Sequence, residues 1–146
     1  MAVNLPSKSI SRVLGALKSA SLRLNQTLLT GILVKYFKIE EFNCQETGNN
    51  LMNPLFLERL DELRDRCGFP FVITSGYRDP THSIEAAKPK PGTHAQGIAA
   101  DIQVVDSVQR HTLLTNAFLL GFSGIGVDKS FIHVDIRDTQ PVTWVY

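Results

Sequence analysis

Three side chains of the types that bind metal ions stand out in the sequence. In GTHAQGIAAD, residues 92–101, a histidine and an aspartate, His94 and Asp101, are separated by glycine and small residues. In FIHVDIR, residues 131–137, side chains alternate as they do along a β-strand, and one of the two faces carries His133. Two imidazoles and one carboxylate leave a fourth coordination position for water. That composition is typical of a catalytic zinc site, whereas structural zinc sites are closed and usually rich in cysteine.

The geometry of paired strands decides whether these residues can meet. Alternation places His133 and Asp135 on the same face of their strand, and Asp101 occupies one face of the preceding strand. If these two strands are neighbours, His133 and Asp101 converge, and a turn at Gly97 brings His94 back over them. Spacing alone also allows a simpler interpretation, in which a turn leads into a buried strand and the histidines serve only as hydrogen-bonding groups.

The other two histidines lack such partners. His82 falls in an expected loop, and His111 falls on the polar face of an expected helix. Neither has a second candidate ligand at a useful spacing. A single histidine in such a setting is usually an ordinary polar side chain, so we expect neither of them to bind the metal.

The elements that must hold these residues are a mixture of helices and strands. Asn53 followed by Pro54 is typical of a helix start, and Asp106 is a second capping residue. Because helices and strands do not alternate as in βαβ units, we expect an α+β fold with a small antiparallel sheet flanked by helices. The expected elements are a helix over 54–67, a short strand over 71–74, a loop over 81–93, a strand over 97–105, a helix over 107–120, a glycine-rich turn over 121–127 and a strand over 131–137.

The N-terminal segment differs in charge from the rest of the chain. Residues 1–39 contain lysines and arginines but no acidic residue, although the net charge of the whole chain is only +1. Apolar residues recur at helical spacing from Ser7 onward, so we expect a basic amphipathic extension over 1–34 and a folded domain over 35–146. Such a segment contacts a membrane surface through residues 7–38, packs on its own domain, or extends freely.

Composition argues against several other classes. No apolar run is long enough to span a membrane, and no clear secretory signal is present. The basic segment lacks interleaved aromatic residues, so we expect no nucleic-acid partner. The two cysteines, Cys44 and Cys67, are compatible with one disulfide or with two reduced thiols, and neither belongs to a C-x-x-C zinc motif.

Four ordered motifs resemble those of the zinc D-Ala-D-Ala carboxypeptidase family, which includes the L-alanyl-D-glutamate endopeptidases that bacteriophages use as endolysins. The motifs are SGYRDP, THAQGIAADI, GIGVDKSFIHVDIR and a late tryptophan, Trp144. The resemblance extends from about Lys35 to Trp144, roughly three quarters of the chain. The resemblance implies a hedgehog/D-Ala-D-Ala-peptidase-like fold, with the basic extension outside the part that resembles the family.

The resemblance also assigns roles to individual residues. It implies that the ligands of a zinc ion are His94, Asp101 and His133. It further implies that Arg78, in the SGYRDP motif, binds a carboxylate of the peptide substrate. Arginine suits that role because its planar guanidinium meets both oxygens of a carboxylate at once.

Two positions depart from the family pattern. Thr93 replaces the usual serine and keeps the hydroxyl. Ser130 occupies the position, three residues before the second metal histidine, where many members carry a glutamate that acts as general base. We favour Asp135 as the base, because an H-x-D form occurs in a branch of the family, and Asp128 in the preceding turn is the other candidate. The alternative for Asp135 is a carboxylate that orients a ligand or Arg137.

The function that the resemblance implies is zinc-dependent hydrolysis of an amide bond in the stem peptides of peptidoglycan, by carboxypeptidase or endopeptidase action. We therefore expect a monomeric metallopeptidase that acts on the cell wall, as a periplasmic or extracellular enzyme or as a phage lysin. Tyr77 and Trp144 are candidates for the cleft wall or for the core. The alternative, favoured by Ser130, is a zinc-containing module that binds the cell wall or supports structure without hydrolysis.

Overall fold

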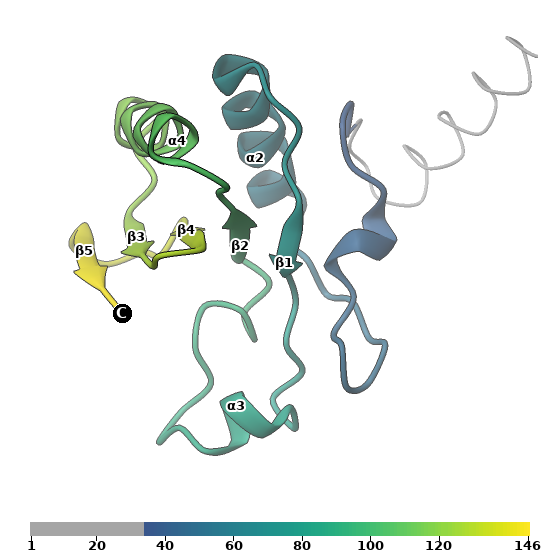
Figure 1. Cartoon of the computed structure of the whole chain (residues 1–146). Coiled ribbons are helices and arrows are strands. Elements are labelled where there is room, and N and C mark those ends of the chain that lie inside the picture. Colours follow the sequence, from purple (N-terminus) through teal and green to yellow (C-terminus); the bar gives the residue numbers. More distant parts are fainter. Residues whose placement is uncertain (1–33) are drawn as a thin grey trace, which may run out of the picture. The chain divides into compact units, whose positions relative to one another are not determined.

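The computed structural model describes residues 34–146, which form a five-stranded sheet with helices (Figure 1). The amphipathic helix expected in the N-terminal extension, and its contact with a membrane surface, lie outside the described residues. Within the described part, no helix is long and apolar enough to cross a membrane. In chain order the elements are the 3₁₀ helix η1 (Ile39–Phe42), α2 (Pro54–Cys67), β1 (Ile73–Ser75), α3 (Ser83–Ala86), β2 (Ala99–Gln103), α4 (Ser107–Leu119), β3 (Gly124–Val127), β4 (Phe131–Asp135) and β5 (Val142–Val145).

The two long helices begin and end close to the positions that the sequence predicts. Asn53 accepts two backbone hydrogen bonds at the start of α2, where Pro54 lacks the N–H group that would otherwise be unpaired. The helix ends at Gly68, whose φ of 72° is the left-handed conformation that favours glycine. Asp106 caps α4 by accepting a hydrogen bond from the backbone N–H of Gln109.

The sheet has the strand order β1-β2-β4-β3-β5. All neighbouring strands are antiparallel except β3 and β5, which are parallel. The two strands that carry candidate metal ligands, β2 and β4, are neighbours, and Asp101 lies directly opposite His133. The expected α+β fold with a small, mainly antiparallel sheet is confirmed.

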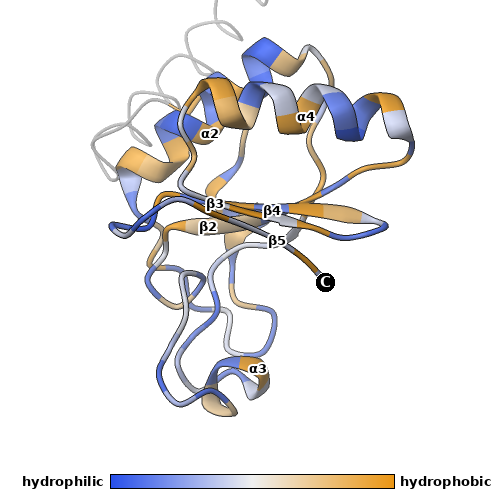
Figure 2. Ribbon diagram, turned by 90° about the vertical axis from the view of Figure 1, so that its left-hand side faces the viewer, coloured by the Kyte–Doolittle hydropathy of each residue, from blue (hydrophilic) through white to orange (hydrophobic). Residues whose placement is uncertain are grey.

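The sheet separates the hydrophobic core from the candidate site. Helices α2 and α4 cover one face, and the segment that carries α3 lies on the other side (Figure 2). Alternate residues of each strand point toward the helices, and the residues on this covered face are apolar. The most deeply buried residues of this core, each no more than 1% exposed, include Phe56, Leu60, Leu63, Ala100, Ile102, Leu113, Ala117, Ile125, Ile132 and Val134.

The largest difference from the sequence prediction is strand β3, which lies in the segment expected to be a glycine-rich turn. Its backbone pairs with β4 on one side and β5 on the other. Glycines occur here because a Cβ atom at Gly124 would overlap the carboxylate of Asp135, and one at Gly126 would overlap the ring of Trp144. The other differences are the short helix α3 inside the expected loop 81–93, the displacement of the first strand from 71–74 to Ile73–Ser75, and the presence of β5 and η1.

Both cysteines are free thiols. Cys44 is buried, and Cys67 is half-buried at the end of α2. Burial raises the pKa of the Cys67 thiol to about 11, so this side chain is a poor nucleophile at neutral pH. Of the two states that the sequence leaves open, the structure has the reduced one.

Candidate metal centre

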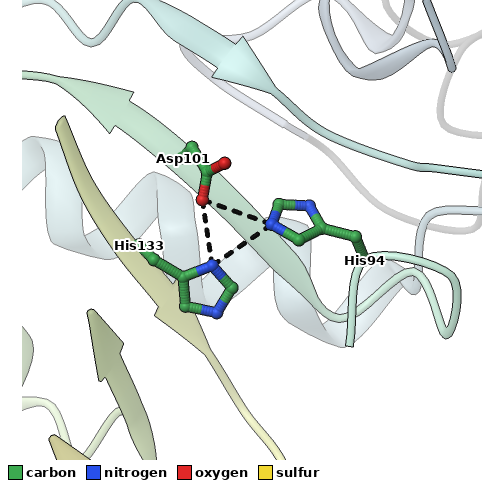
Figure 3. A group of neighbouring side chains, drawn as sticks. All are labelled: His94, Asp101 and His133. Carbon is green, nitrogen blue, oxygen red and sulfur yellow. Dashed lines mark hydrogen bonds and ion pairs between the residues drawn. The ribbon is translucent and has the colours of Figure 1, made fainter. Parts of the chain in front are cut away.

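His94, Asp101 and His133 meet at one point on the face of the sheet opposite the helices (Figure 3). Nδ1 of His133 is 2.9 Å from Oδ1 of Asp101. Nε2 of His94 is 3.2 Å from that same oxygen and 3.2 Å from Nδ1 of His133. The three side chains are buried, with residue exposures between 3% and 5%. The structure therefore brings together the three residues whose types and spacing suggested a metal site.

The backbone explains this convergence. Asp101 on β2 and His133 on β4 are directly opposite each other in the antiparallel ladder. His94 comes from the turn that precedes β2, and the chain folds back at Gly97 with φ of 71°. A Cβ atom at Gly97 would also overlap the carbonyl oxygen of Leu51. Glycine is required here both for its conformation and for the space that it leaves.

Each histidine ring is held by the nitrogen that points away from the cluster. Nδ1 of His94 donates to the carbonyl oxygen of Gly76 at 2.7 Å, and Nε2 of His133 donates to the carboxylate of Asp135 at 2.9 Å. If both rings are neutral and carry their protons on these outer nitrogens, the two inner nitrogens present lone pairs toward Asp101. Metal-binding histidines are usually oriented by a hydrogen bond of this kind.

The donor atoms fit a divalent metal ion. When both rings are neutral, two nitrogen lone pairs and one carboxylate oxygen converge, an arrangement that a cation at their centre stabilises. Tetrahedral zinc with bonds of about 2.0–2.1 Å separates its ligand atoms by about 3.3 Å. The three distances between 2.9 Å and 3.2 Å in this cluster are close to that value. The site is therefore chemically suited to zinc with one position left for water or substrate.

The protonation of the cluster follows from burial and from its hydrogen bonds. Burial lowers the pKa of His94. The hydrogen bond and the negative charge of Asp101 act to raise this pKa but do not fully offset the effect of burial. Burial also acts to lower the pKa of His133, but hydrogen bonds with Asp101 and Asp135 outweigh it and leave this pKa above its usual value. Burial acts to raise the pKa of Asp101, but the two histidines hold it well below its usual range. Asp101 is therefore ionised, as a metal ligand must be.

Asp135 is fully buried between His133 and Arg137. Its Oδ1 accepts hydrogen bonds from the backbone N–H and Nε of Arg137 at 3.1 Å and 2.9 Å, and Oδ2 accepts from Nε2 of His133. Burial acts to raise the pKa of Asp135, but these hydrogen bonds hold it well below its usual range. Such contacts are those of a carboxylate that orients a ligand, the alternative that the sequence leaves open. The role of general base for Asp135 stays a prediction.

A cleft of about 390 Å³ lies beside Asp101, and Arg78 forms part of its wall. Nη2 of Arg78 is 3.0 Å from Oδ2 of Asp101, and Nε donates to the hydroxyl of Ser75 at 2.9 Å. Arg78 thus holds the outer oxygen of a candidate ligand while it lines the cleft with positive charge. Other residues of the cleft wall are Gln45, Thr74, His82, Ile84, Gln103, Ser130 and Phe131.

Ser130 lines this cleft, and Asp128 lies directly behind it. Oδ1 of Asp128 accepts hydrogen bonds from the backbone N–H and the hydroxyl of Ser130, at 2.9 Å and 2.8 Å. These two hydrogen bonds, the backbone one most strongly, lower the pKa of Asp128 below its usual value. Ser130, which replaces the glutamate of the family pattern, therefore places at the cleft a hydroxyl that is hydrogen-bonded to the carboxylate of Asp128.

The two aromatic candidates lie in different places. The ring of Trp144 packs against His133 with 5.1 Å between the ring centroids, and the guanidinium of Arg137 lies 5.1 Å from the tryptophan ring. Tyr77 is buried in the hydrophobic core. Trp144 therefore covers one side of a candidate ligand, whereas Tyr77 belongs to the core.

Sequence reasoning missed two residues at α3. His82, expected to be an ordinary loop histidine, is buried, lines the cleft and caps α3 by accepting the backbone N–H of Ile84. Glu85 is almost completely buried near Arg78. The segment HSIE, residues 82–85, could have indicated this short helix, because a capping position is followed there three residues later by glutamate. His111 is exposed on α4, as expected.

Comparison with known proteins agrees with these observations. Residues 35–135, more than half of the chain, match the family model described as Peptidase M15. This range contains SGYRDP, the histidine and aspartate of THAQGIAADI, and the histidine of β4. No curated protein matches the chain. The family match, together with the His-Asp-His cluster at the expected positions, shows that the chain belongs to the peptidase M15 family, the D-Ala-D-Ala carboxypeptidase-like peptidases of peptidoglycan.

Proposed function

We propose that this chain is a zinc-dependent peptidase that hydrolyses an amide bond in the stem peptides of peptidoglycan. The observation that carries the proposal is the buried cluster of His94, Asp101 and His133 beside a cleft. Two neutral imidazoles and one carboxylate are the donor set of many catalytic zinc sites, which keep a fourth position open. Family membership supplies the substrate class.

The chemistry of the donor set supports zinc. Zinc and transition metals such as copper, iron and nickel bind imidazole nitrogen well, whereas magnesium and calcium prefer oxygen ligands. When bound in such a site, zinc polarises the scissile carbonyl and lowers the pKa of a coordinated water toward about 7. The protein contributes the fixed positions of three ligands, each with a hydrogen bond on its outer side.

Arg78 is the residue that we propose to bind a carboxylate of the substrate. Its Nη2 is already bound to Asp101 and its Nε to Ser75, but its guanidinium also lines the cleft. A substrate carboxylate that binds there lies next to Asp101, so the adjacent amide bond is held at the metal centre. Such positioning replaces a chance encounter by a fixed geometry, which is a large part of the catalytic effect of many enzymes.

Two carboxylates remain as candidates for the group that accepts the proton from water. Asp135 lies next to His133 but is fully buried, and its oxygens are hydrogen-bonded to His133 and Arg137. Asp128 is partly exposed and is bound to Ser130, which lines the cleft. A general base must reach the proton directly or through one water molecule. We keep Asp135 as the proposed base, with Asp128 as the alternative.

The second candidate function is a zinc-containing module that binds the cell wall without hydrolysis. The observation that favours it is Ser130, which lines the cleft at the position where many members carry a catalytic glutamate. A hydroxyl cannot act as the base at neutral pH. Both neighbouring aspartates are hydrogen-bonded, which lowers their basicity.

The family acts on peptidoglycan, which implies a site of action at the cell wall. We propose that the chain works there as a monomer, either in a periplasmic or extracellular compartment or as a lysin encoded by a phage. The proposed partner is a stem peptide with D-configured residues. The N-terminal extension is proposed to contact a membrane surface through residues 7–38.

The test is hydrolysis of purified peptidoglycan by the zinc-loaded full chain, with released fragments identified by mass spectrometry. The proposal predicts fragments that differ from the substrate by the hydrolysis of one type of amide bond, and the fragment masses distinguish carboxypeptidase from endopeptidase action. Binding of zinc and of peptidoglycan without any fragment would reject the peptidase and favour the binding module. The matched control is the same chain after removal of zinc by a chelator, which is expected to release no fragment.

A further inference from the structure

Glu85 is a buried carboxylate to which the proposed reaction gives no role. It lies in α3 and is 1% exposed. Its Oε1 accepts a hydrogen bond from Nζ of Lys88 at 2.8 Å, and its Oε2 accepts one from the backbone N–H of Gly92 at 2.7 Å. Nη1 of Arg78 lies 3.7 Å from Oε1. Because a buried charge is costly even when it is paired, its presence here calls for an explanation.

We propose that Glu85 is a positioning residue that holds the guanidinium of Arg78 in place and thereby sets the strength of Asp101 as a metal ligand. This inference rests on the proposed function, because it assigns Glu85 a part in the same metal centre. The partners of Glu85 are Lys88, Gly92 and Arg78, and none of them is a candidate metal ligand. Glu85 acts through Arg78.

The geometry of Arg78 supports this role. Its nitrogen atoms face three different partners: Ser75 at Nε, Asp101 at Nη2 and Glu85 at Nη1. A guanidinium is planar and rigid, so contacts on three sides fix the whole group and not only one nitrogen. Without Glu85, the contacts on Nε and Nη2 remain but the third side of the group is free. The donors that face the cleft then lose their fixed direction.

The charges point in the same direction. Arg78 lies between two carboxylates, Asp101 and Glu85, so its positive charge is shared between them. Burial acts to raise the pKa of Glu85, but hydrogen bonds from Lys88 and the Gly92 backbone outweigh it, so the carboxylate is ionised at neutral pH. If Glu85 loses its charge, Arg78 is attracted to Asp101 alone. A more strongly neutralised Asp101 is a weaker ligand for a cation.

The test replaces Glu85 by glutamine and measures zinc affinity by titration of the metal-free full chain. Glu85→Gln keeps nearly the same shape and an acceptor oxygen but removes the charge. We expect zinc affinity to fall about tenfold, the lower end of the range for residues that orient metal ligands. We also expect a higher KM for a substrate with a free carboxylate. The matched control is Glu58→Gln, a change of the same kind on the exposed face of α2, which is expected to leave both quantities unchanged.

A double-mutant cycle separates this role from a general structural one. If Glu85 acts through Arg78, then Glu85→Gln has little further effect on zinc affinity in an Arg78→Gln background. An equal tenfold loss in both backgrounds would overturn the inference, because it would mean that Glu85 acts through the loop of Gly92. If Glu85→Gln does not fold, Glu85→Asp serves instead. The shorter side chain withdraws the carboxylate from Nη1 of Arg78, so a fall in zinc affinity is again expected, and an unchanged affinity would reject the proposal.

The two proposals fail in different ways. If the wild-type chain binds zinc and cleaves peptidoglycan while Glu85→Gln binds zinc equally well, the role of Glu85 is wrong and the proposed function stands. If the wild-type chain binds no zinc, the proposed function is wrong and takes the inference with it.

Discussion

The carboxylate of Asp135 lies 2.9 Å from Nε2 of His133, on the opposite side of the imidazole ring from Asp101. Both residues are on β4, two positions apart, so the alternation of the strand places them on the same face. Arg137 binds the same carboxylate and balances its charge. The H-x-D sequence thus has a structural consequence that does not depend on catalysis: it fixes which nitrogen of His133 faces the metal position.

Replacement of Asp135 by asparagine distinguishes its two proposed roles. Asparagine still accepts a hydrogen bond from Nε2 of His133 but can no longer take a proton. If Asp135 only orients His133, zinc affinity is expected to fall about 10–100-fold, with turnover largely retained once zinc is saturating. If Asp135 is the general base, turnover is expected to fall about 100-fold or more even at saturating zinc. The measurement is kcat against zinc concentration, for both proteins.

Replacement of Asp128 by asparagine tests the other candidate. Its hydrogen bonds come from the backbone and hydroxyl of Ser130, both donors that an asparagine oxygen can still accept. If Asp128 is the base, Asp128→Asn abolishes the rise of kcat/KM with pH on the acid side while zinc affinity stays unchanged. An unaltered pH profile with normal turnover would exclude Asp128. Asp138→Asn, a change of the same kind in an exposed residue outside the cleft wall, is the control.

Zinc affinity is expected to increase with pH through the range in which His133 titrates. In the metal-free protein, hydrogen bonds with Asp101 and Asp135 outweigh the effect of burial and raise the pKa of His133 above its usual value. His133 therefore holds a proton at a pH where an ordinary histidine is neutral, and this proton must leave when a metal ion binds. Below that pKa, affinity is expected to fall about tenfold for each pH unit. Calorimetry in buffers of different ionisation enthalpy counts the released proton. An affinity that is constant between about pH 5.5 and 8 would contradict the assignment of His133 as a ligand.

Gly97→Ala is expected to damage both the fold and the metal centre. The left-handed φ of 71° alone costs an alanine about 1–2 kcal/mol, and its Cβ would also overlap the carbonyl oxygen of Leu51. Gly48 is a matched control, because its φ of 74° is similar but a Cβ there has no neighbour within 4 Å. Chemical denaturation should show Gly97→Ala to be less stable than Gly48→Ala by about 1–3 kcal/mol, the usual cost of overpacking. Zinc affinity should be lost only in Gly97→Ala, since that turn carries His94. Equal losses of stability would show that the turn can shift without cost.

The sequence was informative where local rules decide the structure. Capping residues marked both long helices, and strand alternation placed His133 and Asp101 on matching faces. Pairing of β2 with β4 brings the candidate ligands Asp101 and His133 together, as expected. The motif spacing indicates the family from the sequence alone, and the family match over residues 35–135 includes SGYRDP, THAQGIAADI and His133 but not Trp144.

The remaining features depend on contacts between distant segments, which no local rule describes. Strand β3 looked like a turn because its glycines are there to make room for the side chains of Asp135 and Trp144. Helix α3 is only one turn long. The role that we propose for it depends on Glu85, whose carboxylate pairs with Arg78, seven positions earlier in the chain. The assignment of Asp135 depends on the contacts of its two oxygens, which the alternation of the strand leaves undetermined.

The most direct test of the metal centre is the zinc content of the purified full chain, wild type against His133→Ala. The matched control is His111→Ala, because His111 is exposed on α4 and lies outside the cluster. We expect about one zinc ion per chain in the wild type and in His111→Ala, and almost none in His133→Ala. Equal zinc content in all three proteins, or none in the wild type after incubation with zinc, would show that His94, Asp101 and His133 do not bind one metal ion.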